Sequence, residues 1–292
     1  MAAFDAALTE VARRTEAALN DLLPPSSSGR VAEAMRYAVL SGGKRLRAFL
    51  VIEGARLFNV PQLQADRAAA AIECIHAYSL VHDDLPAMDD DDLRRGVPTV
   101  HRVWDDATAI LAGDALQAEA FAILASTRTT PDASVRLKLI GNLAHASGVH
   151  GMVGGQDLDL QAGLYDGDLS LDAITELQEK KTGALIKWAA EAGPILGKSD
   201  IAPMTAYAQA VGLAFQIQDD VLDVIGDAHA AGKALRKDGD AGKATFVSHL
   251  GLDAARNAAR ALVDDACDAL APYHSAADRL RECAKFIVER DR

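Results

Sequence analysis

The sequence contains few of the residues that build sheets or disulfide frameworks. Of its 292 residues only 5% are aromatic, and there are nine prolines and three cysteines. The hydrophobic 50% consists mainly of Ala, Leu, Ile and Val, which is typical of close-packed helices and not of a β-sandwich or barrel. We therefore expect an all-α fold, a helical bundle that forms one large domain over residues 1–292.

Cysteines, basic leader segments and long apolar runs are also scarce. Cys74, Cys267 and Cys283 are an odd number without metal-ligand spacing, so we expect reduced packing residues. The N-terminus carries Asp5 and Glu10 and lacks the basic and apolar segments of a secretory signal. No uninterrupted apolar run approaches the roughly 20 residues that span a bilayer. These features predict a cytoplasmic protein without membrane insertion.

Positive charge is in deficit, with 30 Lys and Arg against 42 Asp and Glu and a net charge of −12. A nucleic-acid partner is excluded, because a phosphate backbone requires a basic surface. Any anion site must then be built locally, from clustered cations or a multivalent metal.

Apolar residues recur at helical spacing along most of the chain, and no stretch alternates convincingly as a strand. The pattern predicts helices over residues 1–23, 30–40, 68–85, 107–126, 134–152, 171–192, 203–224 and 252–271, with a further one that carries Lys44, Arg45 and Arg47. Two aspartate motifs lie well over a hundred residues apart, each at the end of a long apolar helix. A bundle with both motifs at one mouth would explain this arrangement.

The first aspartate motif has six carboxylates between Asp83 and Asp92, followed by Arg94 and Arg95. Like charges this close repel each other, so either solvent screens the run or a metal binds it. A solvated acidic loop is the alternative, but the apolar helix before it and the arginine pair after it favour a metal.

The second aspartate motif, Gln216 to Asp223, lies within a strongly apolar helix. Asp219 and Asp223 are four residues apart, so both carboxylates point to one face. Mg²⁺ is commonly held by one or two carboxylates together with substrate phosphate oxygens. The motif therefore indicates a metal-bridged diphosphate site. A calcium-binding loop is the competitor, but neither motif has the spacing of an EF-hand.

Several basic residues could complete an anion site. Lys44 and Arg47 are spaced to share a face just inside an expected helix N-terminus, which favours anions. His76 lies seven residues before Asp83, so it points along nearly the same stripe, although a lone histidine on an apolar helix is usually a core residue. Further isolated cations follow at Lys180, Lys181, Lys233 and Lys243.

Together these segments resemble the trans-isoprenyl diphosphate synthases, and among them the bacterial farnesyl diphosphate synthases with two extra residues between the aspartates of the first motif. The resemblance runs from Ser41–Gly42–Gly43–Lys44–Arg45–Leu46–Arg47 to Ile287–Val288–Glu289–Arg290, and includes Gly154–Gly155–Gln156 with Asp159, Lys181 to Ile186, and Phe215 to Asp223. It implies an all-helical bundle, usually a homodimer, with both aspartate motifs facing each other across a deep central cavity.

The resemblance also implies a role for each matched residue. The metal ligands are Asp83 and Asp89 for two Mg²⁺ ions and Asp219 for a third, with Mn²⁺ as a possible substitute and Asp84 and Asp223 in support. The allylic diphosphate, dimethylallyl or geranyl, is held by Arg94, Lys181, Lys233 and Lys243. Isopentenyl diphosphate is held by Lys44, Arg47, His76 and Arg95. Thr182 and Gln216 place oxygen atoms beside the allylic carbon.

The implied reaction is Mg²⁺-dependent head-to-tail condensation to (2E,6E)-farnesyl diphosphate by ionisation, condensation and elimination. Three alternatives stay open: a geranylgeranyl diphosphate synthase, an ionising terpene cyclase and a catalytically silent regulatory subunit. A cyclase has no second diphosphate to bind, which Lys44, Arg47, His76 and Arg95 argue against, and the intact charged motifs argue against a silent subunit.

The resemblance also implies that product length depends on Tyr78, the fifth residue before Asp83. In enzymes of this type an aromatic residue there closes the cavity floor after two condensations. The alternative is an ordinary core tyrosine, because on an ideal helix Tyr78 points about 140° away from Asp83.

Overall fold

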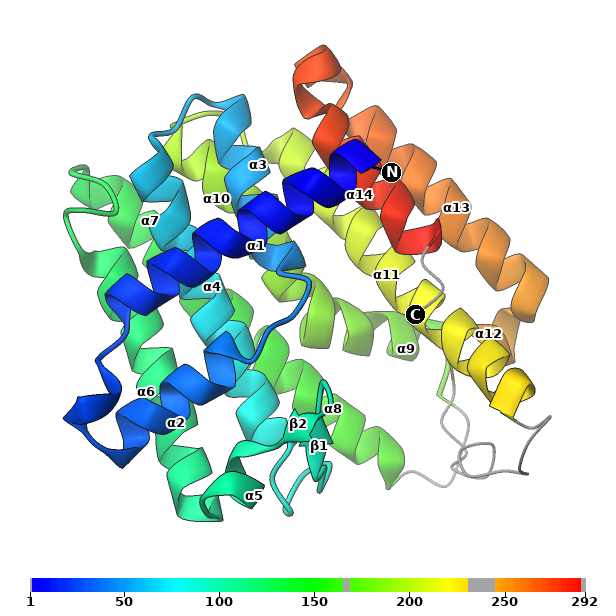
Figure 1. The fold of residues 1–292 in the computed structure, drawn as a ribbon. Helices are drawn as coiled ribbons and strands as arrows, with labels where there is room; N and C mark the ends of the chain where they lie inside the picture. The colour runs from blue at the N-terminus through cyan, green and yellow to red at the C-terminus, as the bar shows by residue number, and fades with distance from the viewer. Residues whose placement is uncertain (1, 165–168, 231–244, 290–292) are drawn as a thin grey trace. The chain divides into compact units, whose positions relative to one another are not determined.

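Helices carry the fold in the computed structural model of the chain, which describes residues 2–164, 169–230 and 245–289 (Figure 1). The described strands are two short segments, β1 (Leu93–Arg94) and β2 (Val97–Pro98). The predicted all-α fold class is confirmed, while the expectation of no strand is wrong in this one place. Two residues are too few for an alternating pattern to show in a sequence.

The chain divides into two compact units, and the prediction of one domain over residues 1–292 stays a prediction. The N-terminal unit comprises Ala2–Asn142 with Glu191–Ser199, and the C-terminal unit comprises Leu143–Ala190 with Asp200–Arg292. Two helices, α7 (Ala133–Ser147) and α10 (Ala184–Leu196), contribute residues to both.

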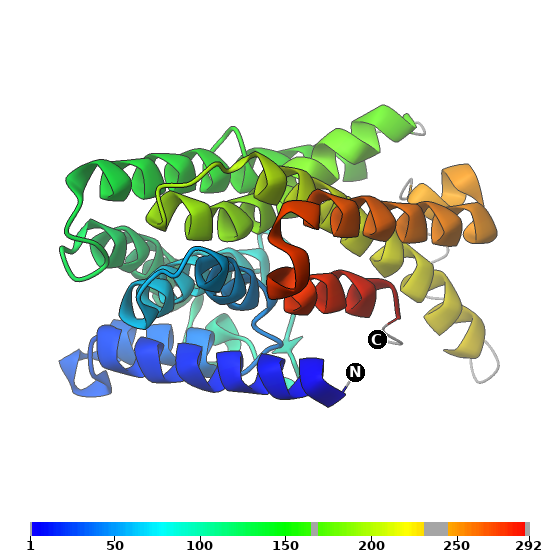
Figure 2. The same cartoon turned by 90° about the horizontal axis from the view of Figure 1, so that it is seen from above.

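The N-terminal unit is built around α4, which contacts α1, α2, α3 and α6. Its elements are α1 (Ala2–Leu22), the 3₁₀ turn η1 (Ser26–Ser28), α2 (Arg30–Leu40), α3 (Leu46–Leu57), α4 (Gln62–Asp83), the two strands, α5 (Val100–Val103) and α6 (Asp106–Ala125). Figure 2 shows α1 as an outer layer along α3 and α4. Four consecutive alanines of α4, Ala68 to Ala71, are completely buried. Their small side chains let neighbouring helices approach closely, as the composition predicts.

Helix α6 combines length with high hydropathy, and it is the helix in the described part of the chain that is long and apolar enough to cross a membrane. About 44% of its most apolar window is buried within the protein. It packs along α4 and α2, so it serves as a core helix of the N-terminal unit.

The C-terminal unit is built around α11, which packs beside α13 and also contacts α12 and α14 (Figures 1 and 2). Its elements are α8 (Met152–Gly163), α9 (Leu171–Gln178), the π-helical segment η2 (Glu179–Gly183), α11 (Ala202–Ala230), α12 (Phe246–Leu250), α13 (Leu252–Ala269), the 3₁₀ segment η3 (Ala271–Ala277) and α14 (Asp278–Glu289). Ile217 and Val221 of α11 join Ile174, Phe246 and Ala255 in one buried cluster.

The helix boundaries differ from the predicted ones in two informative places. The predicted helix over 134–152 ends at Ser147, and a separate helix, α8, starts at Met152. The predicted helix over 171–192 is interrupted by η2, where the backbone changes to i→i+5 hydrogen bonding. Short helices α12 and α14 were not predicted. All three cysteines are free, and Cys74 and Cys283 are buried, as predicted for packing residues.

Candidate functional site

The first aspartate motif folds back against the end of α4. The backbone N–H of Asp89 donates to the carbonyl of Asp83 over 2.8 Å, and that of Asp91 donates to the carbonyl of Asp84 over 3.2 Å. Asp90 takes a left-handed conformation with φ 52°, which allows the reversal. The loop therefore brings Asp83 and Asp89 close together, with Asp83 half-buried and Asp89 exposed.

Asp84 is buried behind this loop. Arg94 donates from Nε to its Oδ1 over 2.8 Å, and from its terminal nitrogen to both Asp84 and Asp91. Burial raises the pKa of Asp84, and the hydrogen bond and charge of Arg94 oppose that rise. In this structure Arg94 thus organises the loop carboxylates, and its predicted contact with the allylic diphosphate stays a prediction.

Of the two basic residues predicted just inside the start of α3, Arg47 lies there and Lys44 does not. Lys44 was expected just inside the helix, but α3 begins at Leu46, so Lys44 precedes it in an exposed turn. The reason is the backbone: Gly42, Gly43 and Arg45 have φ values of 92°, 122° and 53°, and these left-handed conformations prevent an earlier start.

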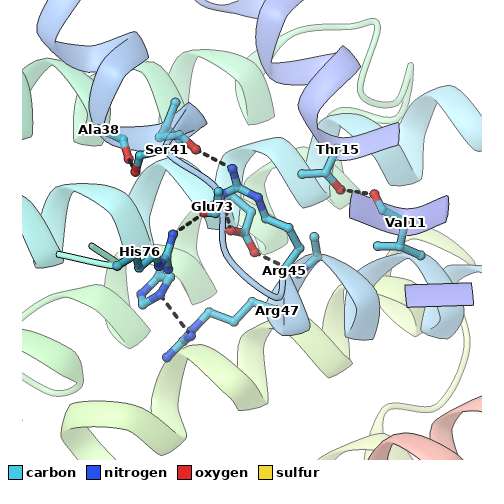
Figure 3. Close-up of polar contacts among 12 residues, drawn as sticks. Val11, Thr15, Ala38, Ser41, Arg45, Arg47, Glu73 and His76 are labelled. Carbon is cyan, nitrogen blue, oxygen red and sulfur yellow. Dashed lines mark hydrogen bonds and ion pairs between the residues drawn. The ribbon is translucent and has the colours of Figure 1, made fainter. Parts of the chain in front are cut away.

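Arg47 is the second residue of α3 and points to α4. Its Nη1 lies 3.4 Å from Nε2 of His76. Figure 3 marks this contact between the two labelled side chains. Burial lowers the pKa of His76 well below its usual value, and the charges of Arg47 and Arg95 lower it further. Arg95, from the turn between the strands, donates to the carbonyl of Gly42. The structure therefore brings Arg47, His76 and Arg95 together around a neutral imidazole.

Tyr78 is buried on α4, with 4% of its surface exposed. Its ring meets the ring of His82 edge-on at 5.8 Å, and Nε2 of His82 lies 3.1 Å from the carbonyl of Ile110 on α6. A β-carbon at Gly113 would collide with the His82 ring. Tyr78 therefore belongs to the side of α4 that packs on α6.

The second aspartate motif borders a cavity of about 290 Å³ within the C-terminal unit. The polar side chains around it include most of the residues of the C-terminal unit that the sequence predicts to bind metal or substrate. They are Asp159, Gln178, Lys181, Thr182, Gln216, Asp219, Asp220, Asp223 and Thr245. The predicted common face of Asp219 and Asp223 is confirmed.

The π-helical segment positions Lys181 and Thr182 at this cavity. Its wider turn packs on α8, where a β-carbon at Gly155 would collide with the backbone nitrogen of Lys181. Lys181 Nζ forms an ion pair with Asp159 Oδ2 at 2.7 Å. Because π segments cost helix stability and recur at functional sites, this one indicates that the placement of Lys181 and Thr182 matters.

Asp220 joins the cavity wall to the following helix. Its Oδ2 accepts the backbone N–H of Phe246, the first residue of α12, over 2.7 Å. Burial raises the pKa of Asp220 to about 6, and the neighbouring charges of Asp223 and Asp219 add to the rise. The carboxylates therefore repel each other, as expected for a site that requires cations.

Some site residues lie outside the sequence prediction or outside the described structure. Lys233 and Lys243 fall in residues 231–244, which the structure does not describe. Asp159, Asp220 and Thr245 were given no role, although Asp159 was part of the resemblance. Gln156, on the same helix as Asp159, has both amide atoms buried without a hydrogen-bond partner among the described residues. Only its place within the Gly154–Gly155–Gln156 motif pointed to it in the sequence.

Comparisons with known proteins agree with this arrangement. The polyprenyl synthetase family model matches residues 29–284. The farnesyl diphosphate synthase of Escherichia coli is 47% identical over 277 residues, which cover 92% of each chain, and that of Haemophilus influenzae is 46% identical over 91% of this chain and 90% of its own. A crystal structure described as an FPP/GFPP synthase from Zymomonas mobilis in the apo form is 48% identical, with a TM-score of 0.90, and the match covers 98% of this chain and 99% of that one. The chain therefore belongs to the polyprenyl synthetase family.

Proposed function

We propose that this protein is a Mg²⁺-dependent prenyltransferase that condenses isopentenyl diphosphate with dimethylallyl and then geranyl diphosphate to form farnesyl diphosphate. The observation that carries the proposal is the cavity of the C-terminal unit, where Asp219 and Asp223 lie with Lys181, Thr182 and Gln216. The family and the farnesyl diphosphate synthase names of relatives that match over most of their length support the same reaction.

The carboxylates of the two aspartate motifs suit Mg²⁺ that is bound together with a diphosphate. In the described parts of the chain no three His, Cys, Asp or Glu side chains are gathered closely enough to hold a metal by themselves. Mg²⁺ is typically held by one or two carboxylates and completes its octahedron with water and phosphate oxygens. Asp83 and Asp89 would hold two ions and Asp219 a third, with support from Asp84 and Asp223. Mg²⁺ held by these residues would supply the positive charge that neutralises the departing diphosphate.

The protein's own side chains bind and orient the two substrates separately. The residues assigned to the allylic diphosphate are Arg94, Lys181, Lys233 and Lys243. Lys44, Arg47, His76 and Arg95 hold isopentenyl diphosphate. His76 is neutral at pH 7, so it contributes a hydrogen bond rather than a charge. Two separately built pockets explain how an acidic protein holds two anions.

The reaction then needs no nucleophilic side chain. The allylic carbon–oxygen bond breaks, and the oxygen atoms of Thr182 and Gln216 stabilise the positive charge that develops on the allylic carbon. The double bond of isopentenyl diphosphate attacks that carbon, and the released diphosphate removes the proton that restores a double bond. One diphosphate leaves for each new carbon–carbon bond.

The protein acts as a homodimer. Three large apolar side chains of α6 and α7 support this assignment, because Ile110, Leu111 and Leu137 are 45%, 52% and 70% exposed. Large apolar side chains left exposed to water are available to a partner surface. Light scattering coupled to size-exclusion chromatography measures the assembly directly, and a mass of one chain would contradict it.

Tyr78 limits the product to fifteen carbons, because its side chain closes the floor of the cavity. The residue is buried where α4 packs on α6, and it lies roughly 7.5 Å along the helix axis from Asp83. A longer product is the second candidate, because the Zymomonas mobilis relative is described as an FPP/GFPP synthase.

Product analysis tests both the activity and its length. Wild-type protein supplied with isopentenyl and dimethylallyl diphosphates and Mg²⁺ should release mainly farnesyl diphosphate, and Tyr78→Ala should shift the product to twenty carbons or more. Tyr273→Ala, a half-buried tyrosine of the C-terminal unit, is the matched control and should keep the fifteen-carbon product. An unchanged spectrum for Tyr78→Ala would place the floor at Ser79 or along α6. Release of cyclic hydrocarbon without condensation would refute the proposed function.

A further inference from the structure

Glu73 is a buried carboxylate on α4 that the sequence analysis left without a role. Only 3% of its side chain is exposed, and it forms an ion pair at 3.0 Å with Arg45, whose side chain is also 3% exposed. Removing two charges from water is costly, and such a pair persists only where further hydrogen bonds satisfy it. Groups around Glu73 and Arg45 must therefore supply the further hydrogen bonds that stabilise this buried ion pair.

The first part of that environment is the start of α3. The residue that precedes this helix is Arg45, which has no acceptor for the unsatisfied N–H groups of the first turn. The backbone N–H of Ala48 instead donates to Oε1 of Glu73 over 3.1 Å. Glu73 thus caps α3 from a different helix, while its other oxygen holds Arg45.

Arg45 in turn fixes the end of the preceding helix. Its second terminal nitrogen donates to the carbonyl of Val39 near the end of α2. The turn that carries Lys44 is therefore held at both ends by one ion pair, which Figure 3 shows between α3 and α4.

The second part of the environment is the proposed isopentenyl diphosphate pocket. Arg47 lies between Arg45 and Ala48 in sequence, so capping of Ala48 also sets its position. His76 lies three residues after Glu73 on α4, which places both on one side of that helix. The 3.4 Å approach of Arg47 to His76 therefore depends on the same contacts that Glu73 makes.

Glu73 also offsets the repulsion within a cluster of cations. Its charge favours the ionised form of Arg47, whereas the charge of Arg95 disfavours it. An apolar pair in place of Arg45 and Glu73 could join the helices as firmly, but it would leave Arg47 and Arg95 to repel one another without a balancing carboxylate before the anion arrives.

We infer that Glu73 is a positioning residue for isopentenyl diphosphate: through the backbone of Ala48 and the side chain of Arg45 it holds Arg47 opposite His76. The inference rests on the proposed function and adds to it a carboxylate that binds no substrate itself.

Removing the Glu73 charge can change the binding of isopentenyl diphosphate in two opposite ways. If Glu73 only weakens the positive field, Glu73→Gln should strengthen binding of isopentenyl diphosphate. If it positions Arg47, the same variant should raise KM for isopentenyl diphosphate about tenfold or more, the value of one charge-assisted contact, while KM for geranyl diphosphate changes less than about twofold. Glu73→Asp keeps the charge on a shorter side chain and should recover part of the loss.

The double variant Arg45→Met/Glu73→Met distinguishes a loss of positioning from a loss of the folded state. Replacing both partners of a buried pair leaves no unpaired charge, so its melting temperature should stay near that of the wild type. Its KM for isopentenyl diphosphate should still be raised. Asp66→Asn is the matched control, because Asp66 is another carboxylate of α4, paired with Arg14 at 2.6 Å, and this variant should change neither KM.

The possible results distinguish a failure of the Glu73 positioning role from a failure of the proposed function. A lowered or unchanged KM for isopentenyl diphosphate in Glu73→Gln, or a wild-type KM in the double variant, would overturn the positioning role while the proposed function stands. Wild-type protein that does not condense the two diphosphates would overturn both.

Discussion

The N-terminal and C-terminal units each gather charged side chains, but of opposite sign. In the N-terminal unit, Arg45, Arg47 and Arg95 gather around a neutral His76, and buried Glu73 balances them. In the C-terminal unit, Asp219, Asp220 and Asp223 share a cavity with Lys181, itself paired with Asp159. Under the proposed function, the cationic region accepts a diphosphate directly, whereas the acidic region binds one through a metal. In the proposed function, a protein of net charge −12 therefore binds two anions at sites whose charge is built locally.

The largest effect should come from removing a carboxylate of the acidic region. We expect Asp219→Ala to reduce turnover by about two orders of magnitude or more, because its ligand oxygen and the charge stabilisation that depends on it are lost. The measurement is steady-state rate against Mg²⁺ concentration, with circular dichroism to confirm the fold. Asp253→Ala, whose carboxylate is 96% exposed on α13, is the control and should behave as wild type. A variant of Asp219 that retains more than about a tenth of the activity would remove this residue from the ligand set.

A smaller effect should separate the two regions by substrate. Arg47→Ala should weaken isopentenyl diphosphate about ten- to a hundredfold and the allylic diphosphate much less, since one charge-assisted contact is worth roughly 1.5–3 kcal/mol. Lys181→Ala should show the reverse preference. Isothermal titration of each diphosphate into each variant measures the split. Equal losses for both diphosphates in either variant would mean that the regions do not bind different substrates.

The smallest effect concerns the neutral imidazole of the cationic region. The pKa of His76 in the folded protein lies below its ordinary value of about 6.5, so the unfolded chain binds the proton more readily. Above pH 6.5 His76 is neutral in both states, so it does not lower the free energy of unfolding. As the pH falls from 6.5 toward the folded pKa, the unfolded chain gains the proton first, and the free energy of unfolding decreases by up to about 1.4 kcal/mol per pH unit.

Denaturant unfolding at pH 7 and pH 5.5 measures whether the free energy of unfolding decreases on acidification. Wild type should lose more stability on acidification than His76→Asn, by about 1 kcal/mol. His145→Asn removes an exposed histidine and serves as the control. NMR should show that the His76 ring does not titrate near pH 6.5, and an ordinary titration there would contradict the shielded, cation-surrounded environment.

Much of the helical fold could be read from the sequence, but some boundaries could not. The spacing of apolar residues predicted α6 to within one residue at each end, whereas α4 begins at Gln62, six residues before its predicted start. The break at Gly148 to Gly151 and the π segment at Glu179–Gly183 were missed, because hydrophobic periodicity continues across both. Lys44 was placed inside α3, because the sequence does not show that Arg45 adopts a left-handed conformation.

The sequence by itself determined the residue types and spacings of the chemistry: two aspartate motifs, their helical faces, and clustered cations in an acidic chain. These follow from local rules, since i and i+4 positions share a helix face in any context. Only the tertiary structure decided which distant residues meet. The cap that Glu73 of α4 provides to α3, the contact of Asp220 with Phe246, and the close approach of Gly155 to Lys181 all join separate elements. Such contacts depend on how helices pack against each other, and the pattern along one helix does not contain that information.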